Sequence, residues 1–112
     1  MELPVVNHPD YVAKINDDNK FPIKKFGALA EYLLKVNVVK KFFIPKECSI
    51  KTMQTSHSLE YINHIRNKSL DIKLQKKIGF PINDSVARRS FVATGGTVLA
   101  SKLALDSKLA CN

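Results

Sequence analysis

Long apolar runs are absent from this 112-residue sequence, and cysteine and arginine are scarce. No apolar stretch reaches the roughly 20 residues that a membrane-spanning helix needs, so we expect no membrane partner. The two cysteines, Cys48 and Cys111, lie far apart without metal-type spacing, which favours a reducing cytoplasm. No basic segment followed by an apolar stretch opens the sequence, so we also expect no signal peptide.

Acidic residues are outnumbered: 18 lysines and arginines face 10 aspartates and glutamates, which gives a net charge of +8. Such an excess is typical of nucleic-acid-binding proteins. The positive residues are nearly all lysines, however, and they are spread along the whole chain. No zinc-finger spacing, RNA-binding aromatic motif or helix-turn-helix pattern accompanies them. We therefore expect solvated lysines rather than a nucleic-acid site, and a true nucleic-acid binder would show steeply salt-dependent affinity.

What is present is an ordinary globular composition, 45% hydrophobic and 25% charged, without repeats, low-complexity tracts or linkers. This length fits one small domain with a core of its own. Strands alternate with helices in the pattern, which predicts an α/β fold in which about three short strands form one side of a larger parallel sheet, with most of the chain helical. The expected strands are 3–6, 42–44 and 108–112, and the expected helices are 23–37, 50–55, a helix begun by Ser58, 68–78 and 85–107.

Two local features of the long final helix need an explanation. Gly95 and Gly96 each cost a helix roughly 1 kcal/mol against alanine, so the close approach of another backbone is expected there, with the helix packed tightly on the sheet. Arg88 and Arg89 stand near the helix N-terminus, where positive charge is unfavourable. A specific carboxylate partner is therefore expected for them.

The sequence contains His-Pro-Asp-Tyr at 8–11, the His-x-x-x-Tyr spacing of His57 and Tyr61, and Gly95-Gly96-Thr97 in the final expected helix. Together with several other stretches, these resemble bacterial proteins of the histone deacetylase superfamily, nearest the class IV type. Their order over nearly the whole chain carries the resemblance. The matching stretches are 8–11, 20–26, 56–62, 76–81, 88–100 and 110–112.

The resemblance implies a zinc-dependent amidohydrolase with the three-layer arginase/deacetylase fold, of which residues 1–112 form a single, partial N-terminal domain. In that family an Asp-x-His pair and a further aspartate bind zinc, and a tandem His-His does acid–base work on the metal-bound water. The family's Gly-Gly-x-His-His motif would follow residue 112. We therefore expect these 112 residues alone to carry no catalytic residue and no metal ligand, and to be inactive.

The resemblance also assigns positions around the substrate. Loops containing Phe21-Pro22 and Gly79-Phe80-Pro81 would form the rim of the substrate channel, where an apolar wall suits the aliphatic stem of an acyl-lysine. Lys20 stands where relatives usually carry an arginine that lines an internal cavity behind the metal. Lysine keeps the charge but loses the rigid guanidinium fork.

The histidines fit structural roles better than catalytic ones. His57 and His64 are seven residues apart, whereas a zinc pair on one helix is normally four apart. For His8, which precedes Pro9, a hydrogen bond at a strand end is expected.

Three interpretations of the chain stay open at this point: a truncated deacetylase, one half of a split enzyme whose second chain carries the catalytic part, and a non-catalytic binding or scaffold module. The complete enzyme would act on acetylated protein or on a small acyl amide.

Overall fold

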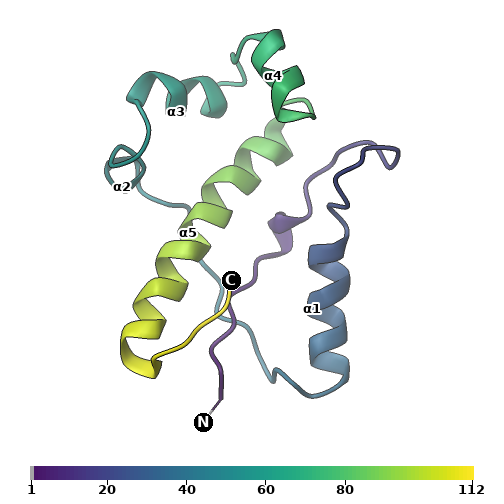
Figure 1. Ribbon diagram of the computed structural model, residues 1–112, viewed down its shortest axis with the longest axis vertical. Helices are drawn as coiled ribbons and strands as arrows, with labels where there is room; N and C mark the ends of the chain where they lie inside the picture. The colour runs from purple at the N-terminus through teal and green to yellow at the C-terminus, as the bar shows by residue number, and fades with distance from the viewer. Residues whose placement is uncertain (1) are drawn as a thin grey trace.

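The computed structural model describes residues 2–112, and helices dominate it (Figure 1). The longest helix, α5, runs through the middle of the molecule, with α1 on one side and α2, α3 and α4 gathered around its N-terminal half. The elements in chain order are η1 (Pro9–Tyr11), α1 (Lys25–Lys35), α2 (Ile50–Met53), α3 (Leu59–Arg66), α4 (Ile72–Ile78) and α5 (Asp84–Ser107).

Side-chain caps explain where α2, α3 and α5 begin, at or within one residue of the predicted starts, whereas α1 and α4 begin two and four residues later than predicted. The Ser49 hydroxyl accepts a hydrogen bond from the Thr52 amide at the start of α2, and the Ser58 hydroxyl accepts one from the Tyr61 amide at the start of α3. Asn83 caps α5 through the Val86 amide. Each bond satisfies an amide that has no partner within its helix.

The core lies around the N-terminal half of α5, where α3 and the segments before and after it pack together. Ile62 and Ile65 are the buried side chains of α3, and Val92 on α5 is fully buried. The main cluster of buried residues comprises Ala13, Ile23, Cys48, Met53, Ile62, Ile65, Leu70, Ile82, Val86, Ala87 and Phe91.

The predicted α/β architecture is wrong. Residues 2–112 contain no sheet: the three segments expected to be strands meet only through two isolated parallel bridges, Val5 with Cys111 and Val6 with Phe43. Prolines explain why pairing does not extend, because Pro4 and Pro45 flank the paired residues and cannot donate to a ladder. Such short pairing contributes little stability by itself, and the helices hold the chain together.

The Gly95–Gly96 pair does allow a close approach, as predicted, although not to a sheet. A Cβ atom at Gly95 would overlap the carbonyl oxygen of Lys46, which lies in the segment before α2. A Cβ atom at Gly96 would overlap the Tyr11 hydroxyl, which donates a 2.5 Å hydrogen bond to the Asn112 side-chain oxygen. The two glycines therefore allow α5 to contact η1, the segment before α2 and the last residue, Asn112.

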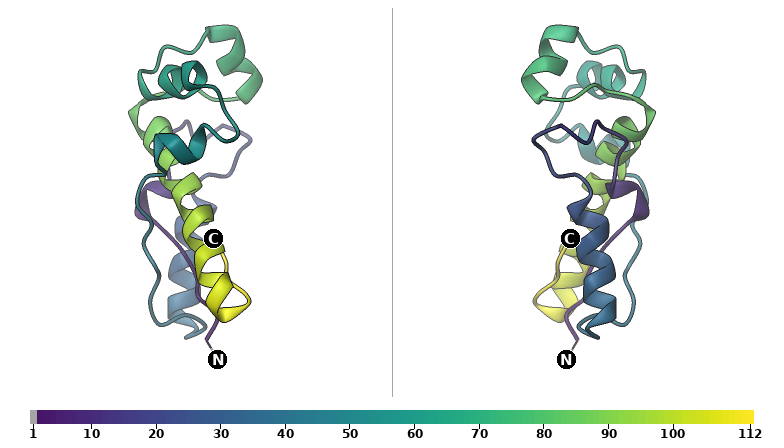
Figure 2. Two further views of the ribbon diagram at one scale, coloured as in Figure 1. Left: turned by 90° about the vertical axis from the view of Figure 1, so that its left-hand side faces the viewer. Right: turned by 90° about the vertical axis from the view of Figure 1, so that its right-hand side faces the viewer.

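The molecule is a thin layer, with extents of 46 × 34 × 17 Å (Figure 2). Helix α1 buries none of its side chains, and its Leu29 and Tyr32 are 56% and 59% exposed. Apolar side chains are also exposed at the other end of the chain, at Leu105 and Leu109. Within residues 2–112, no helix combines the length and the apolar character that crossing a membrane requires.

Candidate functional site

The two loops that the resemblance assigns to a channel rim lie side by side. The Asn19 side chain donates a 3.0 Å hydrogen bond to the carbonyl oxygen of Gly79, and the ring centroids of Phe21 and Phe80 are 6.0 Å apart. The structure thus brings together residues that are about 60 positions apart in the sequence. Their role in a substrate channel stays a prediction.

Local hydrogen bonds shape both loops. The Asn19 side-chain oxygen accepts from the Phe21 amide, which turns the chain just before Phe21. In the other loop, Gly79 ends α4 with a φ of 101°, a left-handed conformation that glycine adopts without a Cβ clash. Gln75 then fixes the exit from that loop, because its amide nitrogen donates to Leu70 O and its amide oxygen accepts from Ile82 N.

Two open hollows flank the joined loops. The first, of about 440 Å³, is lined by Asn19, Lys20, Phe21, Ile78, Gly79 and Phe80. The second, of about 340 Å³, is lined by Ile72, Gln75, Lys76, Gly79, Phe80 and Pro81. We call them the Lys20 hollow and the Lys76 hollow. They share Gly79 and Phe80, whereas Pro22 lines neither.

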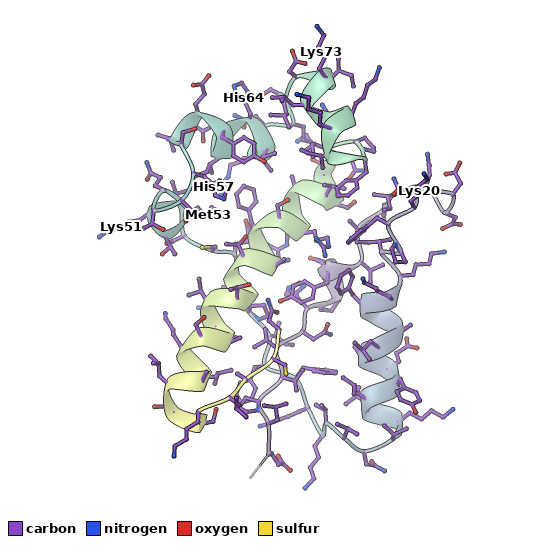
Figure 3. All side chains as sticks on the ribbon, viewed as in Figure 1. Lys20, Lys51, Met53, His57, His64 and Lys73 are labelled. Carbon is purple, nitrogen blue, oxygen red and sulfur yellow. The ribbon has the colours of Figure 1, made fainter. Side chains whose placement is uncertain are left out.

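Behind the loops lies an apolar cavity of about 270 Å³ between α3 and the N-terminal half of α5. Its wall is mostly aliphatic, and His57, Tyr61 and Arg89 are among its few polar side chains. Met53 and His57 lie on the α2–α3 side, facing α5 (Figure 3). Phe80 lines this cavity as well as both hollows, so its ring stands between the outer rim and the interior.

Arg89 contacts the aromatic residues of the rim from the interior side, a role that the sequence did not indicate. Its guanidinium lies 4.9 Å from the centroid of Phe26 and 5.8 Å from that of Phe21, and its Nε donates a 2.7 Å bond to the Tyr11 carbonyl. Burial lowers the pKa of Arg89, because desolvation disfavours its charge. The stacked rings and the carbonyl compensate for that desolvation and hold Phe21 in place.

The neighbouring Arg88 has the carboxylate partners that the sequence predicts. Its Nε donates to Asp10 at 3.1 Å and its Nη1 to Glu47 at 2.6 Å. The bond to Asp10 is the main cause that raises the pKa of Arg88. This pair of contacts ties α5 to η1 and to the segment before α2.

Lys20 is exposed and lines the Lys20 hollow (Figure 3). It is not among the residues that line the 270 Å³ cavity. Its assignment to an internal cavity behind a metal stays a prediction.

The histidines are dispersed. The His8 Nδ1 accepts from the Asp10 amide at 2.9 Å and caps η1, while His64 is bonded to Ser69 at 2.8 Å. His57 stacks against Tyr61 with ring centroids 5.5 Å apart. In the described part of the chain, no three His, Cys, Asp or Glu side chains are grouped so that they could hold a metal ion.

No protein-family model matches the sequence. The chain is similar to an uncharacterized protein of the cyanobacterium Picosynechococcus sp., with 36% identity over 114 residues. The match covers 100% of this chain and 38% of that protein. The chain thus spans less than half the length of the curated relative that it matches.

Proposed function

We propose that these residues form the N-terminal segment of a zinc-dependent amidohydrolase of the histone deacetylase superfamily, class IV-like, and that the segment supplies one wall of its acyl-lysine channel. The observation that carries the proposal is the contact between Phe21 and Phe80. It joins the two loops that the resemblance assigns to the channel rim. An aromatic wall beside an apolar cavity suits the four-carbon stem of an acylated lysine.

The chemistry itself is assigned to residues beyond these 112. Within residues 2–112, no three His, Cys, Asp or Glu side chains are grouped as zinc ligands. The length of the Picosynechococcus protein, of which this chain covers 38%, is consistent with a larger enzyme. The exposed apolar side chains of α1 and of the C-terminal residues offer a surface that further chain could cover.

A first experiment tests the assignment of the chemistry. Zinc-dependent release of acetate from acetyl-lysine peptides would be measured for the 112-residue chain, and for the same chain joined to or co-expressed with the catalytic part. We expect activity only when both parts are present. Activity of the 112 residues alone would refute the assignment of the chemistry to other residues, and inactivity of both preparations would refute the hydrolase.

A second experiment tests the wall. In the active assembly, Phe21→Ala should raise the KM for an acetyl-lysine peptide about five- to tenfold, because truncation removes apolar surface that the lysine stem would cover. Tyr32→Ala is the matched control, since Tyr32 is an exposed aromatic residue on α1 that lines neither hollow. Equal KM values for the two variants would contradict a channel wall at Phe21.

A non-catalytic binding module is the second candidate, and one observation favours it. Helices α2, α3 and α5 carry their own side-chain caps and surround a contiguous core, as expected of a unit that folds by itself. A cooperative unfolding transition of the 112 residues, together with inactivity of the two-part assembly, would favour this candidate.

A further inference from the structure

Positive charge borders the hollows at the rim. The Lys20 hollow and the Lys76 hollow are each bordered by one ammonium group, and no carboxylate lines either of them. The remaining lining is largely apolar, with Phe21, Ile72 and the shared Phe80. A ligand that fills both hollows would therefore combine apolar groups with negative charge.

Most lysines of the described chain form no ion pair, and what distinguishes Lys20 and Lys76 is that they border the hollows. Lys24 pairs with Asp17 at 2.9 Å, and Lys68 pairs with Asp84 at 2.7 Å. Among residues 2–112, Lys20 and Lys76 have no carboxylate within 4.0 Å.

Three acidic residues lie near them in sequence, Asp17, Asp18 and Asp71, and none of the three lines either hollow. Asp17 makes its ion pair with Lys24, and the Asp71 carboxylate accepts a 2.7 Å hydrogen bond from the Lys73 amide at the start of α4. The positive charge at the rim is thus available to a ligand.

The register of α4 places Lys76 specifically at the rim. Ile72, Gln75, Lys76 and Gly79 follow the spacing of one helical face, and all four line the Lys76 hollow. Lys77, the next residue, lines neither hollow. Because Gln75 bonds to Leu70 and Ile82, the floor of the Lys76 hollow is held before any ligand arrives.

We propose that the two hollows form a docking site for an acidic peptide segment, with an apolar side chain on Phe80 and carboxylates near Lys20 and Lys76. The binding of such a peptide does not depend on the proposed function. Its role in substrate choice does rest on the proposed function: the site would then select acylated lysines that lie in acidic sequence. Opposite charge at such a rim contributes mainly to specificity and to the association rate.

A peptide is favoured over a nucleic acid because of the lining. Two lysines border five largely apolar positions, and no arginine lines either hollow. Nucleic acids are typically bound through several arginine and lysine contacts to phosphates. An extended peptide instead alternates its side chains, so an apolar group and acidic groups can meet different parts of the rim.

The test is a binding measurement that needs no hydrolysis. A short fluorescent peptide with glutamates around a central leucine, and its glutamine counterpart, would be titrated with the 112-residue chain and with the active two-part assembly by anisotropy. We expect the glutamate peptide to bind more tightly, and more weakly as salt is added. Lys20→Glu and Lys76→Glu should each reduce its affinity about three- to tenfold.

Lys77→Glu is the matched control, because it makes the same change of charge on the same helix outside the hollows. An equal loss with Lys77→Glu would show attraction to the overall charge of +8 and would overturn the proposal. Equal affinity for the glutamine peptide, or stronger binding to vesicles of anionic lipid or to single-stranded DNA, would overturn it too. Because binding is read directly, its failure is distinguishable from the absence of deacetylase activity.

Discussion

At the residue scale, Gly95 and Gly96 are neighbours with different surroundings. The space beside Gly95 is filled by backbone of the Lys46–Cys48 segment, whereas the space beside Gly96 is filled by the side chains of Tyr11 and Asn112. Backbone cannot move aside cheaply, but side chains can change rotamer. The same substitution should therefore have unequal costs at the two positions.

We expect Gly95→Ala to reduce the free energy of unfolding by about 1–3 kcal/mol or more, despite the better helix propensity of alanine. Gly96→Ala should cost less, and part of its cost should disappear in a Tyr11→Phe background, because the hydroxyl that the new methyl would meet is then gone. Urea unfolding of the single and double variants measures this.

Gly27→Ala is the control, since a Cβ there meets only a Val12 methyl at 3.2 Å. A near-neutral Gly95→Ala variant would contradict the close packing of α5 on Lys46.

Tyr11 gives the fold a dependence on alkaline pH. Burial raises the pKa of Tyr11 above its ordinary value of 10.0, although Arg89 and the bond to Asn112 act in the opposite direction. A raised pKa in the folded state means that the contribution of the neutral phenol is fully present below pH 10.0 and is lost as the pH rises through the folded pKa.

We therefore expect the difference in unfolding free energy between the wild type and Tyr11→Phe to be constant at neutral pH and to shift against the wild type above pH 10.0. Chemical denaturation followed by circular dichroism across that range measures it. A difference that does not change with pH would show that the Tyr11 phenol ionises equally well in the folded and unfolded chain.

The sequence predicted some of these single-residue features and missed others. The glycine pair signalled a close contact because glycines are costly in a helix, and Arg88 signalled a carboxylate because positive charge is unfavourable at a helix start. Arg89 carried the same signal, yet its partners are aromatic rings and a carbonyl. The rings of Phe21 and Phe26 reach Arg89 only through the folding of the chain, so the sequence around Arg89 could not identify them as its partners.

At the element scale, local chemistry sets the helix boundaries. Serine and asparagine caps begin three helices, and Gly79 ends α4. The end of α5 lacks such a residue: Lys108 adopts the left-handed region with a φ of 70°, which is unfavourable for a residue with a Cβ. This position therefore stores local strain.

Replacing Lys108 by glycine should raise the free energy of unfolding by up to about 1 kcal/mol, because relief of the left-handed conformation outweighs the added freedom of the unfolded chain. Lys102→Gly, inside the C-terminal part of α5, is the matched control and should lower the free energy of unfolding by about 1 kcal/mol. Thermal and urea unfolding of both variants measure the difference. A loss of stability in both would contradict the left-handed helix end.

The helices could be predicted and the sheet could not, for one physical reason. A helix satisfies its backbone within its own segment, so apolar periodicity and caps suffice to locate it. A strand needs a partner elsewhere in the chain, and the apolar segments at 3–6, 42–44 and 108–112 pair at only single positions. Apolar content and position indicated that these segments lie together, but not how far the pairing extends.

At the scale of the whole molecule, the chain is less compact than its length allows. Its radius of gyration is 15.3 Å, whereas about 13 Å is typical of a compact domain of roughly this size. The core is gathered around one half of α5, whereas Leu105 in the opposite half and Leu109 just after the helix are exposed. The sequence indicated enough apolar residues for a core, but it did not indicate that only part of them would be buried together.

The resemblance identified the two loops of the candidate rim before the structure was known. Their direct contact could not be predicted, since Asn19 and Gly79 carry no signal that they would be bonded. The lysine-bordered hollows depend on that contact, because they share residues from both loops.

The 17 Å thickness of the molecule limits what its surface hollows can do. A helix with its side chains is already about 10–12 Å across, so the layer is scarcely deeper than one helix with a loop beside it. Such a layer can form one wall of a site, but residues 2–112 do not extend far enough to form the opposite wall as well. Dehydration of a bound group at this rim must therefore come from the ligand itself or from protein outside residues 2–112, and the strength of any charge interaction there depends on what covers it.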